Sequence, residues 1–380
     1  MKLFRLTVIL VFLFSIAHFC FAETGVFPKH IVFVTHQPLS GPAKEYSDIG
    51  KSAQAYFKYV NDQGGVHGRS IELKIIDDQL KPYKAKKEME ELTLKNDIFA
   101  VFSGIGSKTH QAVYPLLKQQ RLPSFFVGSD LPEWTQPIRA NVFGFMPTAE
   151  TEARVIGKYI TEKHTGKEFI IWYAEKPVYQ RAVKVLTKEL YSVSAKLLPG
   201  KAGRLSAEWK LIRRNNPDFL VVLGNYTDVM TFLKFSPQIN IPMLTGHALA
   251  DSRLPEWLGQ KVSERVRVLT AYPLKIETEH PGQILHKLIL SEYAPNLALN
   301  RWTLYGHAVA ELMVEVLNRT GRSLSRQKAV SAAESITKWQ GKLLPPVYLD
   351  SRNHLALTTF RVSRITYGRV SHLSGWIDGK

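Results

Sequence analysis

Apolar and polar residues follow one another along the chain in two rhythms. Short runs that are apolar throughout, such as residues 98–102, 169–173 and 219–223, predict strands covered on both faces. Between them, apolar residues recur at spacings of three and four, most clearly over residues 48–61, which predicts amphipathic helices. Strands separated by helices of about 10–15 residues indicate β-α-β units around a parallel sheet. The pattern therefore predicts an α/β fold.

The strand–helix alternation starts afresh after residues 141–148, which predicts two successive doubly wound halves. Predicted strands lie at 30–36, 71–76, 98–102, 123–127, 169–173, 219–223, 242–245 and 266–271. Predicted helices lie at 48–61, 81–95, 108–120, 150–164, 179–191, 207–214, 228–235, 283–293, 301–319 and 325–339. Two short strand-like runs, 358–361 and 364–367, follow in the tail. No period of 20–50 residues is visible, so a solenoid is excluded.

The first 22 residues predict an export signal. Two basic residues precede an apolar run over 6–19, and residues 20–22 (CFA) form a cleavage sequence with small first and third positions, so we expect cleavage after Ala22. The run is shorter than the ~20 apolar residues of a membrane span. A lipoprotein modified at Cys20 is the alternative, although Phe19 occupies a position where that signal requires a small residue.

The amino-acid composition excludes several classes of protein. The 380 residues contain 45% hydrophobic and 22% charged residues, which fits about two globular domains and excludes a disordered chain. The single Cys excludes a disulfide scaffold and any multi-Cys zinc or iron–sulfur site. We therefore expect an exported globular protein whose large core needs no cross-links.

The chain is basic, with 50 Lys and Arg against 33 Asp and Glu and a net charge of +17. Removal of residues 1–22 takes away two basic residues and no acidic ones, which leaves +15. The basic residues are spread along the chain without a recognition motif, so we expect no nucleic-acid partner. The excess charge fits either a solvated basic surface or attraction to anionic ligands or membrane surfaces.

Motifs for catalysis are missing from the sequence. It contains no G-x-S-x-G elbow, no P-loop and no H-E-x-x-H motif. Gly104 and Gly106 begin a dinucleotide-like fingerprint, but Thr109 stands where its third glycine belongs. No two His residues lie three or four apart on a clear helix face. We therefore expect no cofactor, no metal and no catalytic residues.

Three loops that follow predicted strands are rich in small polar groups: residues 103–107, 128–130 and 225–227. In open α/β sheets, ligands bind beyond the carboxyl ends of the strands. Free N–H groups and hydroxyls beside a helix N-terminus can receive an anion. Ordinary turn and N-cap roles for the same residues are the alternative.

The sequence also resembles a known family, the type I periplasmic solute-binding proteins of ABC transporters, in their branched-chain amino acid (Leu/Ile/Val) group. The matching stretches are 38–78 (PLSGPAKEYSDIGKSAQAYFKYVNDQGGVHGRSIELKIIDD), 101–135 (VFSGIGSKTHQAVYPLLKQQRLPSFFVGSDLPEWT) and 141–160 (NVFGFMPTAETEARVIGKYI). Residues 64–78 are the most specific part, and the resemblance weakens after about residue 200.

The resemblance implies two Rossmann-like lobes joined by a three-crossing hinge, which close on a small-molecule ligand held between them. Lobe 1 would comprise 28–148 plus 275–350, and lobe 2 would comprise 149–274 plus 351–380.

The resemblance also implies a set of ligand-binding residues. Loops of lobe 1 would hold a ligand carboxylate through Ser103, Gly106, Ser107, Thr109, Gly128, Ser129 and Asp130. Tyr179 and Tyr226 of lobe 2 would close over the ligand, and Tyr46 would form part of the wall. Packing inside a lobe is the alternative role of each tyrosine.

The chain departs from this family at two positions. His247 stands about where amino-acid binders carry an acid for the ligand ammonium, and Asp130 would repel a carboxylate. A buried ammonium without a partner would cost several kcal/mol. We therefore expect a ligand other than a standard branched-chain amino acid, and a less zwitterionic molecule, apolar or aromatic, is the alternative.

The resemblance implies a periplasmic protein that delivers its ligand to the permease of an ABC transporter and meets the membrane only through that transporter. A periplasmic sensor for a regulatory partner is one alternative. An exported enzyme that uses Asp130 or Asp251 is another.

Overall fold

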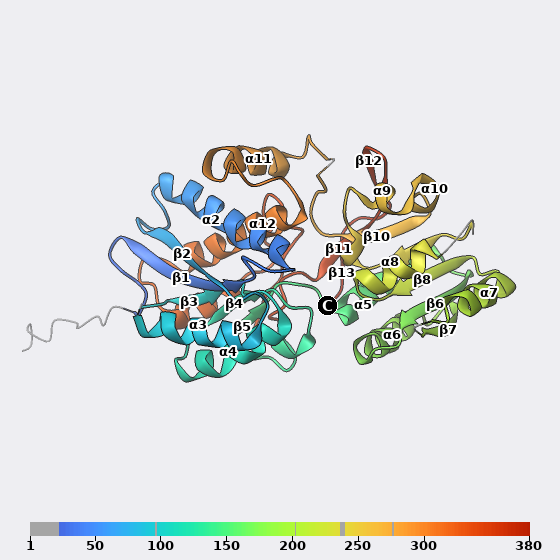
Figure 1. Ribbon diagram of the computed structural model, residues 1–380, viewed down its shortest axis with the longest axis horizontal. Coiled ribbons are helices and arrows are strands. Elements are labelled where there is room, and N and C mark those ends of the chain that lie inside the picture. Colours follow the sequence, from blue (N-terminus) through green and yellow to red (C-terminus); the bar gives the residue numbers. More distant parts are fainter. Residues whose placement is uncertain (1–22, 96, 202, 236–239, 276) are drawn as a thin grey trace, which may run out of the picture.

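The computed structural model describes residues 23–95, 97–201, 203–235, 240–275 and 277–380. The predicted export signal, with its cleavage site and Cys20, lies outside these residues. Two α/β halves lie side by side along the long axis of the molecule (Figure 1). In the described residues, no helix is long and apolar enough to cross a membrane.

The first half is built on a five-stranded parallel sheet with the order β2-β1-β3-β4-β5. Its strands are β1 (His30–Gln37), β2 (Ser70–Asp77), β3 (Ala100–Phe102), β4 (Ser124–Val127) and β5 (Val142–Gly144). Its helices are η1 (Lys44–Tyr46), α2 (Ser47–Asp62), α3 (Pro82–Lys95), α4 (Ser107–Gln119), η2 (Pro132–Trp134), α11 (Pro281–Tyr293), α12 (Arg301–Thr320) and α13 (Arg326–Glu334).

Helices cover both faces of this sheet, with α2 and α12 on one side and α3 and α4 on the other (Figure 1). Strand β1 shows why its sequence is apolar throughout. Ile31 and Phe33 pack into the core that includes α2 and α12, whereas Val32 and Val34 pack against α3 and α4. Alternate residues of a strand point to opposite faces, so a strand covered on both faces needs apolar residues at every position.

The second half is built on an eight-stranded sheet with the order β12-β11-β10-β9-β8-β6-β7, and β13 pairs with β11. Its strands are β6 (Glu168–Ala174), β7 (Ser194–Gly200), β8 (Phe219–Leu223), β9 (Met243–Thr245), β10 (Val266–Thr270), β11 (Thr359–Thr366), β12 (Arg369–His372) and β13 (Ile377–Asp378). Its helices are α5 (Ala149–Lys163), α6 (Pro177–Glu189), α7 (Leu205–Asn215), α8 (Tyr226–Lys234), η3 (His247–Leu249), α9 (Leu254–Leu258) and α10 (Gln260–Ser263).

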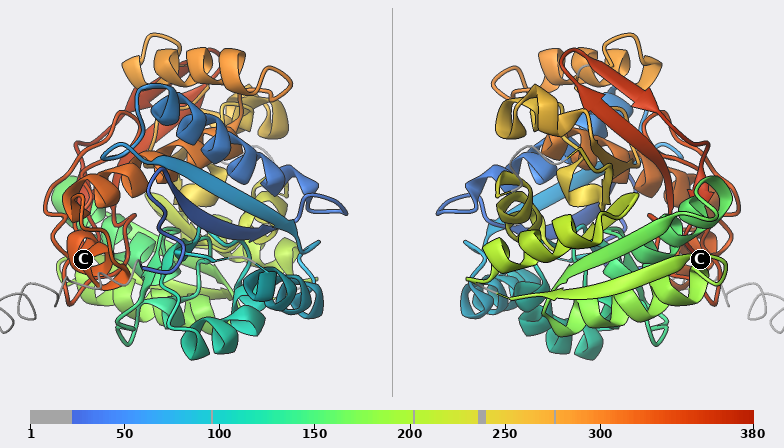
Figure 2. Two further views of the ribbon diagram at one scale, coloured as in Figure 1. Left: turned by 90° about the vertical axis from the view of Figure 1, so that its left-hand side faces the viewer. Right: turned by 90° about the vertical axis from the view of Figure 1, so that its right-hand side faces the viewer.

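Strands β6 to β10 of this sheet are parallel, and the tail adds an antiparallel edge. Figure 2 shows this edge in its right-hand view as a long hairpin of β11 and β12. The chain passes between the two halves three times: from β5 to α5, from β10 to α11, and from α13 to β11. The predicted α/β class, with two doubly wound halves and three crossings, is confirmed.

Several elements differ from the sequence-based expectation, and three of them show why. Strand β7 was missed because it is an edge strand with polar positions and a proline, so no continuous apolar run marks it. The runs 358–361 and 364–367 form one strand, β11. The helix expected over 325–339 ends at Glu334, because the segment beyond it turns back and Trp339 pairs with Val347.

Candidate functional site: a cleft between the two halves

A cavity of about 600 Å³ lies between the two halves, and we call it the cleft. Its volume falls in the range of about 300–1,000 Å³ typical of small-molecule sites. Side chains from the first half line one wall: Glu45, Tyr46, Asp130, Arg301 and Trp302. The opposite wall comes from the second half, chiefly Glu152, Tyr179, Asn225, Tyr226, Thr227, His247, Ala248, Arg253 and Trp257.

Five aromatic side chains give the cleft apolar walls. In the first half, the rings of Tyr46 and Trp302 lie 4.4 Å apart. In the second half, Tyr226 meets Trp257 edge to face at 5.6 Å, and Tyr179 projects from the first turn of α6. Rings of this kind bury a large apolar area at a small entropic cost, so the cleft suits a ligand with an apolar or aromatic body.

Helix starts place several of these side chains. Helix α8 begins at Tyr226, and the side chain of Asn225 caps it by accepting the N–H of Asp228. Helix α12 begins at Arg301, where the side chain of Asn300 accepts the N–H groups of residues 302 and 303. A capped first turn has a fixed direction, so it fixes the side chains that leave it.

Glu152 of α5 is the most constrained carboxylate of the cleft. Its Oε1 accepts the backbone N–H of His247 at 2.9 Å. A Cβ on Gly246 would overlap this carboxylate, so the glycine makes room for it. Burial raises the pKa of Glu152 to about 7, and the charge of Asp130 adds to the rise, whereas the N–H of His247 opposes it.

The two walls share one electrostatic environment. Burial raises the pKa of Tyr46 on one wall and of Tyr179 on the other, and the charge of Asp130 contributes to both shifts. Glu152 contributes to the shift of Tyr179 as well. The two carboxylates and the two phenols therefore lie close enough to influence one another across the cleft.

Both arginines of the cleft already have partners. Arg253 makes two hydrogen bonds to the carboxylate of Asp251, at 3.0 and 2.9 Å, and its guanidinium lies 4.9 Å from the ring centre of Trp257. Arg301 donates from Nη1 to the carbonyl oxygen of Ala248 at 2.9 Å, which joins the first half to the second. Its guanidinium lies 4.7 Å from the ring centre of Trp302.

His247 is held neutral at the back of the cleft. Its Nδ1 donates to the Leu269 carbonyl at 3.3 Å, and its Nε2 accepts from the Tyr272 hydroxyl at 3.2 Å. Burial lowers the pKa of His247 to about 3, and the charge of Arg301 contributes. A neutral imidazole with both nitrogens bonded serves to shape the wall.

Five of the residues predicted from the sequence line the cleft: Tyr46, Asp130, Tyr179, Tyr226 and His247. The other six lie outside its lining: Ser103, Gly106, Ser107, Thr109, Gly128 and Ser129.

These six residues bond mainly within and between the loops that follow β3 and β4. The hydroxyls of Ser107 and Ser129 bond to each other at 2.7 Å, and Thr109 donates to the Ile105 carbonyl at 2.7 Å. Ser103 is fully buried. At Gly106, with φ +98°, a Cβ would crowd Thr109 and Leu80, and at Gly128 it would overlap Ile105.

Sequence reasoning missed several residues of the cleft: Glu45, Glu152, Arg253, Trp257, Arg301 and Trp302. The loop after β9 contributes no acid to the lining of the cleft, whereas α5 contributes Glu152. A ligand other than a standard branched-chain amino acid stays a prediction. The asparagine caps before Tyr226 and Arg301 were a usable signal, because they mark helix starts next to aromatic residues.

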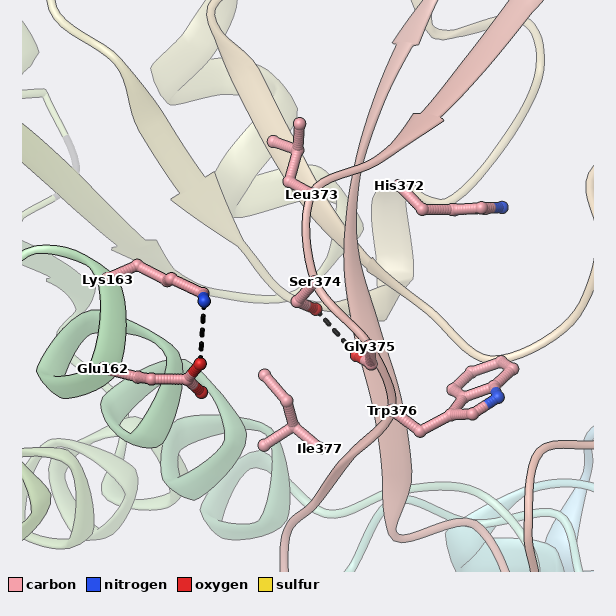
Figure 3. Close-up of a pocket in the computed structure, with 8 residues that line it drawn as sticks. All are labelled: Glu162, Lys163, His372, Leu373, Ser374, Gly375, Trp376 and Ile377. Carbon is pink, nitrogen blue, oxygen red and sulfur yellow. Dashed lines mark hydrogen bonds and ion pairs between the residues drawn. The ribbon is translucent and has the colours of Figure 1, made fainter.

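A second pocket, of about 490 Å³, lies between the end of α5 and the strands β12 and β13 (Figure 3). The two charged side chains of α5 there, Glu162 and Lys163, pair with each other at 2.8 Å, and Ser374 donates to a neighbouring carbonyl. These groups satisfy one another, so the cleft is the stronger candidate. No group of three or more metal-binding side chains occurs in the part of the chain that the structure describes.

Several solved structures have a fold similar to that of this chain. A possible leucine/isoleucine/valine-binding protein from Rhodopirellula baltica is 16% identical, with a TM-score of 0.69 and coverage of 91% of this chain and 96% of that chain. A branched-chain amino acid ABC transporter protein from Thermus thermophilus with bound valine is 16% identical, with a TM-score of 0.72 and coverage of 92% and 97%.

A fatty acid ABC transporter substrate-binding protein from Thermomonospora curvata is 18% identical, with a TM-score of 0.71 and coverage of 94% of each chain. These proteins share the fold but bind different kinds of ligand, so they leave the ligand of this chain to be argued from its own residues. No curated protein sequence matches the chain. The family model for periplasmic binding proteins matches residues 34–369, and the chain therefore belongs to the periplasmic binding protein family.

Proposed function

We propose that this chain is an exported solute-binding protein that captures a small organic molecule in the cleft and delivers it to the permease of an ABC transporter. One observation carries the proposal: aromatic and charged side chains from both halves converge on a single cavity of ligand size. Family membership supports a binding role. We further propose that the export signal is cleaved after Ala22, so that the protein acts in the periplasm.

The two halves would act as the lobes of a hinged clamp. We assign 28–148 plus 275–350 to lobe 1 and 149–274 plus 351–380 to lobe 2. The three crossings would carry the hinge, because hinge residues lie where few segments connect two bodies. The hydrogen bond from Arg301 to Ala248 would form on closure, since its two partners belong to different lobes.

The pairing of Asp251 supports binding rather than catalysis. Both of its oxygens bond to Arg253, which also holds the pKa of Asp251 below its usual value against the effect of burial. A carboxylate that is already charged and doubly bonded is poorly suited to proton transfer.

The test is ligand binding by the chain from residue 23 to 380, followed by recovery of the ligand. We expect a small organic molecule to raise the melting temperature and to be recovered unchanged, because native-state binding at about 100 times Kd adds about 2.7 kcal/mol. Conversion of the molecule into a product would contradict the proposal.

A pair of tyrosine variants locates the binding site. Tyr179→Ala removes a ring from the cleft, so we expect affinity to fall by about tenfold or more with little change in the melting temperature of the free protein. Tyr191→Ala removes a ring that is 84% exposed and outside the cleft, so affinity should stay the same. Equal losses from both variants, by calorimetric titration, would place the site elsewhere.

A further inference from the structure

We propose that the cleft recognises an organic cation: a molecule whose protonated or quaternary nitrogen sits between Asp130 and Glu152 and whose apolar or aromatic body lies between the aromatic walls. This inference rests on the proposed function and names the class of ligand. It departs from the amino acids and fatty acids named for proteins of the same fold.

The charges that line the cleft are unevenly matched. Arg253 is neutralised by Asp251, and Arg301 is held by the carbonyl of Ala248 and lies over Trp302. Among the described residues, no basic side chain lies within ion-pair distance of Asp130 or Glu152, although both line the cleft. The cavity therefore presents carboxylates whose positive partner is missing, in a protein that is strongly basic as a whole.

A cation between these carboxylates would offset the unfavourable electrostatic energy of their charged forms. Burial and the neighbouring charge of Asp130 disfavour the ionised form of Glu152 and raise its pKa to about 7. An opposite charge within a few ångströms favours the ionised form of a carboxyl group. Binding of a cation would thus stabilise both carboxylates.

The walls suit a cation as well. The faces of tyrosine and tryptophan rings attract ammonium groups, most strongly where water is excluded. Tyr46 and Tyr179 line opposite walls of the cavity that Asp130 also lines, and the charge of Asp130 contributes to the pKa shifts of both tyrosines. A nitrogen bound beside Asp130 would therefore share this cavity with two tyrosine rings.

The cleft offers less to a carboxylate. The hydroxyls of Ser107 and Ser129, which were candidates for that role, bond to each other outside the lining. Arg301 is the one lining cation, among the described residues, without a carboxylate partner, and it already has the Ala248 carbonyl as an acceptor. A zwitterion that uses Arg301 for its carboxylate is the main competitor.

The test compares ligands that share a body and differ in charge. Tyramine, tyrosine and the corresponding deaminated acid form one set, and isoamylamine, leucine and its deaminated acid form another, with choline as a quaternary cation. We expect the tightest binding to come from a cation, at least about tenfold above the zwitterion and the acid of its set. Tightest binding by a zwitterion or an acid would overturn the inference.

Failure of this inference can be told apart from failure of the proposed function. One outcome is that none of these cations binds while neutral or anionic compounds from a wider panel raise the melting temperature. In that case the inference of a cationic ligand is wrong, and the proposed binding function stands. If no compound of any class binds, and no small molecule is released when the purified protein is denatured, the proposed function itself fails.

Variants test whether the two carboxylates are responsible for the affinity for a cation. Glu152→Gln and Asp130→Asn should each weaken binding of the cation by about tenfold or more, because each removes a charge that faces it. Glu150→Gln is the matched control, because Glu150 belongs to the same helix but pairs with Arg181 outside the cleft. Equal affinity of all three variants for the cation would overturn the assignment.

Discussion

At the scale of single residues, the environment of Glu152 disfavours the charged form of its carboxylate. The groups that influence it are Asp130 from the loop after β4, Tyr179 from α6 and the backbone N–H of His247. Among the described residues, only the backbone N–H of His247 forms a hydrogen bond to it. The free protein therefore retains an unfavourable carboxylate at the place where we expect the ligand to bind.

This setting predicts a stability change with pH. The pKa of Glu152 is raised in the folded protein to about 7, from 4.5, so the folded state binds this proton more tightly than the unfolded state. Stability should therefore fall as pH rises from about 4.5 to 7, by about 3 kcal/mol at most. Glu152→Gln should be more stable than the parent at pH 8, and the difference should vanish near pH 4.5.

Urea unfolding at the two pH values measures this difference. Glu150→Gln provides the baseline, because the carboxylate of Glu150 is partnered by Arg181 and does not line the cleft. A stability gain from Glu152→Gln that is the same at both pH values would mean that the carboxylate is not the source.

Helix starts carry the binding side chains at the scale of the element. Asn225 and Asn300 each cap a helix through a capping box, and the residues that follow them reach into the cleft. Asn300 also donates to Asp48, which ties the start of α12 to α2. The same caps that stabilise the helices therefore aim the ligand-binding groups.

A comparison of two helix caps tests this coupling. Asn300→Ala should lower the free energy of unfolding by about 1 kcal/mol and also weaken ligand binding, because Arg301 and Trp302 leave the same turn. Ser325→Ala removes the cap of α13, away from the cleft, so it should lower stability by a similar amount and leave affinity unchanged. Unchanged affinity in both variants, by calorimetric titration, would show that the cap only stabilises its helix.

At the scale of the whole molecule, the described residues form few polar contacts between the two halves across the cleft. The bond from Arg301 to the Ala248 carbonyl joins α12 to the loop after β9. At the crossings buried rings lie in contact, such as Phe143 of β5 and His354 in the segment from α13 to β11, whose centres lie 4.1 Å apart. The first contact can open while the second persists, as a hinge requires.

Loss of the Arg301 contact should therefore open the free protein. Arg301→Ala should increase the radius of gyration measured by X-ray scattering without ligand, because a contact made only in the closed form is removed. Arg253→Ala is the matched control: it also removes an arginine from the cleft, but one whose hydrogen bonds stay within its own half. An unchanged radius for Arg301→Ala would mean that this bond does not hold the halves together.

The fold was predictable because its signals are local. Apolar runs such as residues 98–102 and 219–223, separated by helical stripes, mark strands that are buried on both faces wherever they lie in the sheet. Strand β7 and the end of α13 were not predictable in this way. Strand β7 forms because it pairs with β6, and α13 ends where the chain turns back on itself. Neither feature leaves a periodic signal in the sequence.

The sequence by itself determined the α/β class, the two doubly wound halves and the aromatic residues near the strand ends. Only the tertiary structure decided which polar residues share the cleft. Glu150 and Glu152 are equal candidates in the sequence, yet the helix turns the first toward Arg181 and the second toward His247. A ligand site is formed by segments that lie far apart in the chain, so its charge balance appears only when the halves are placed against each other.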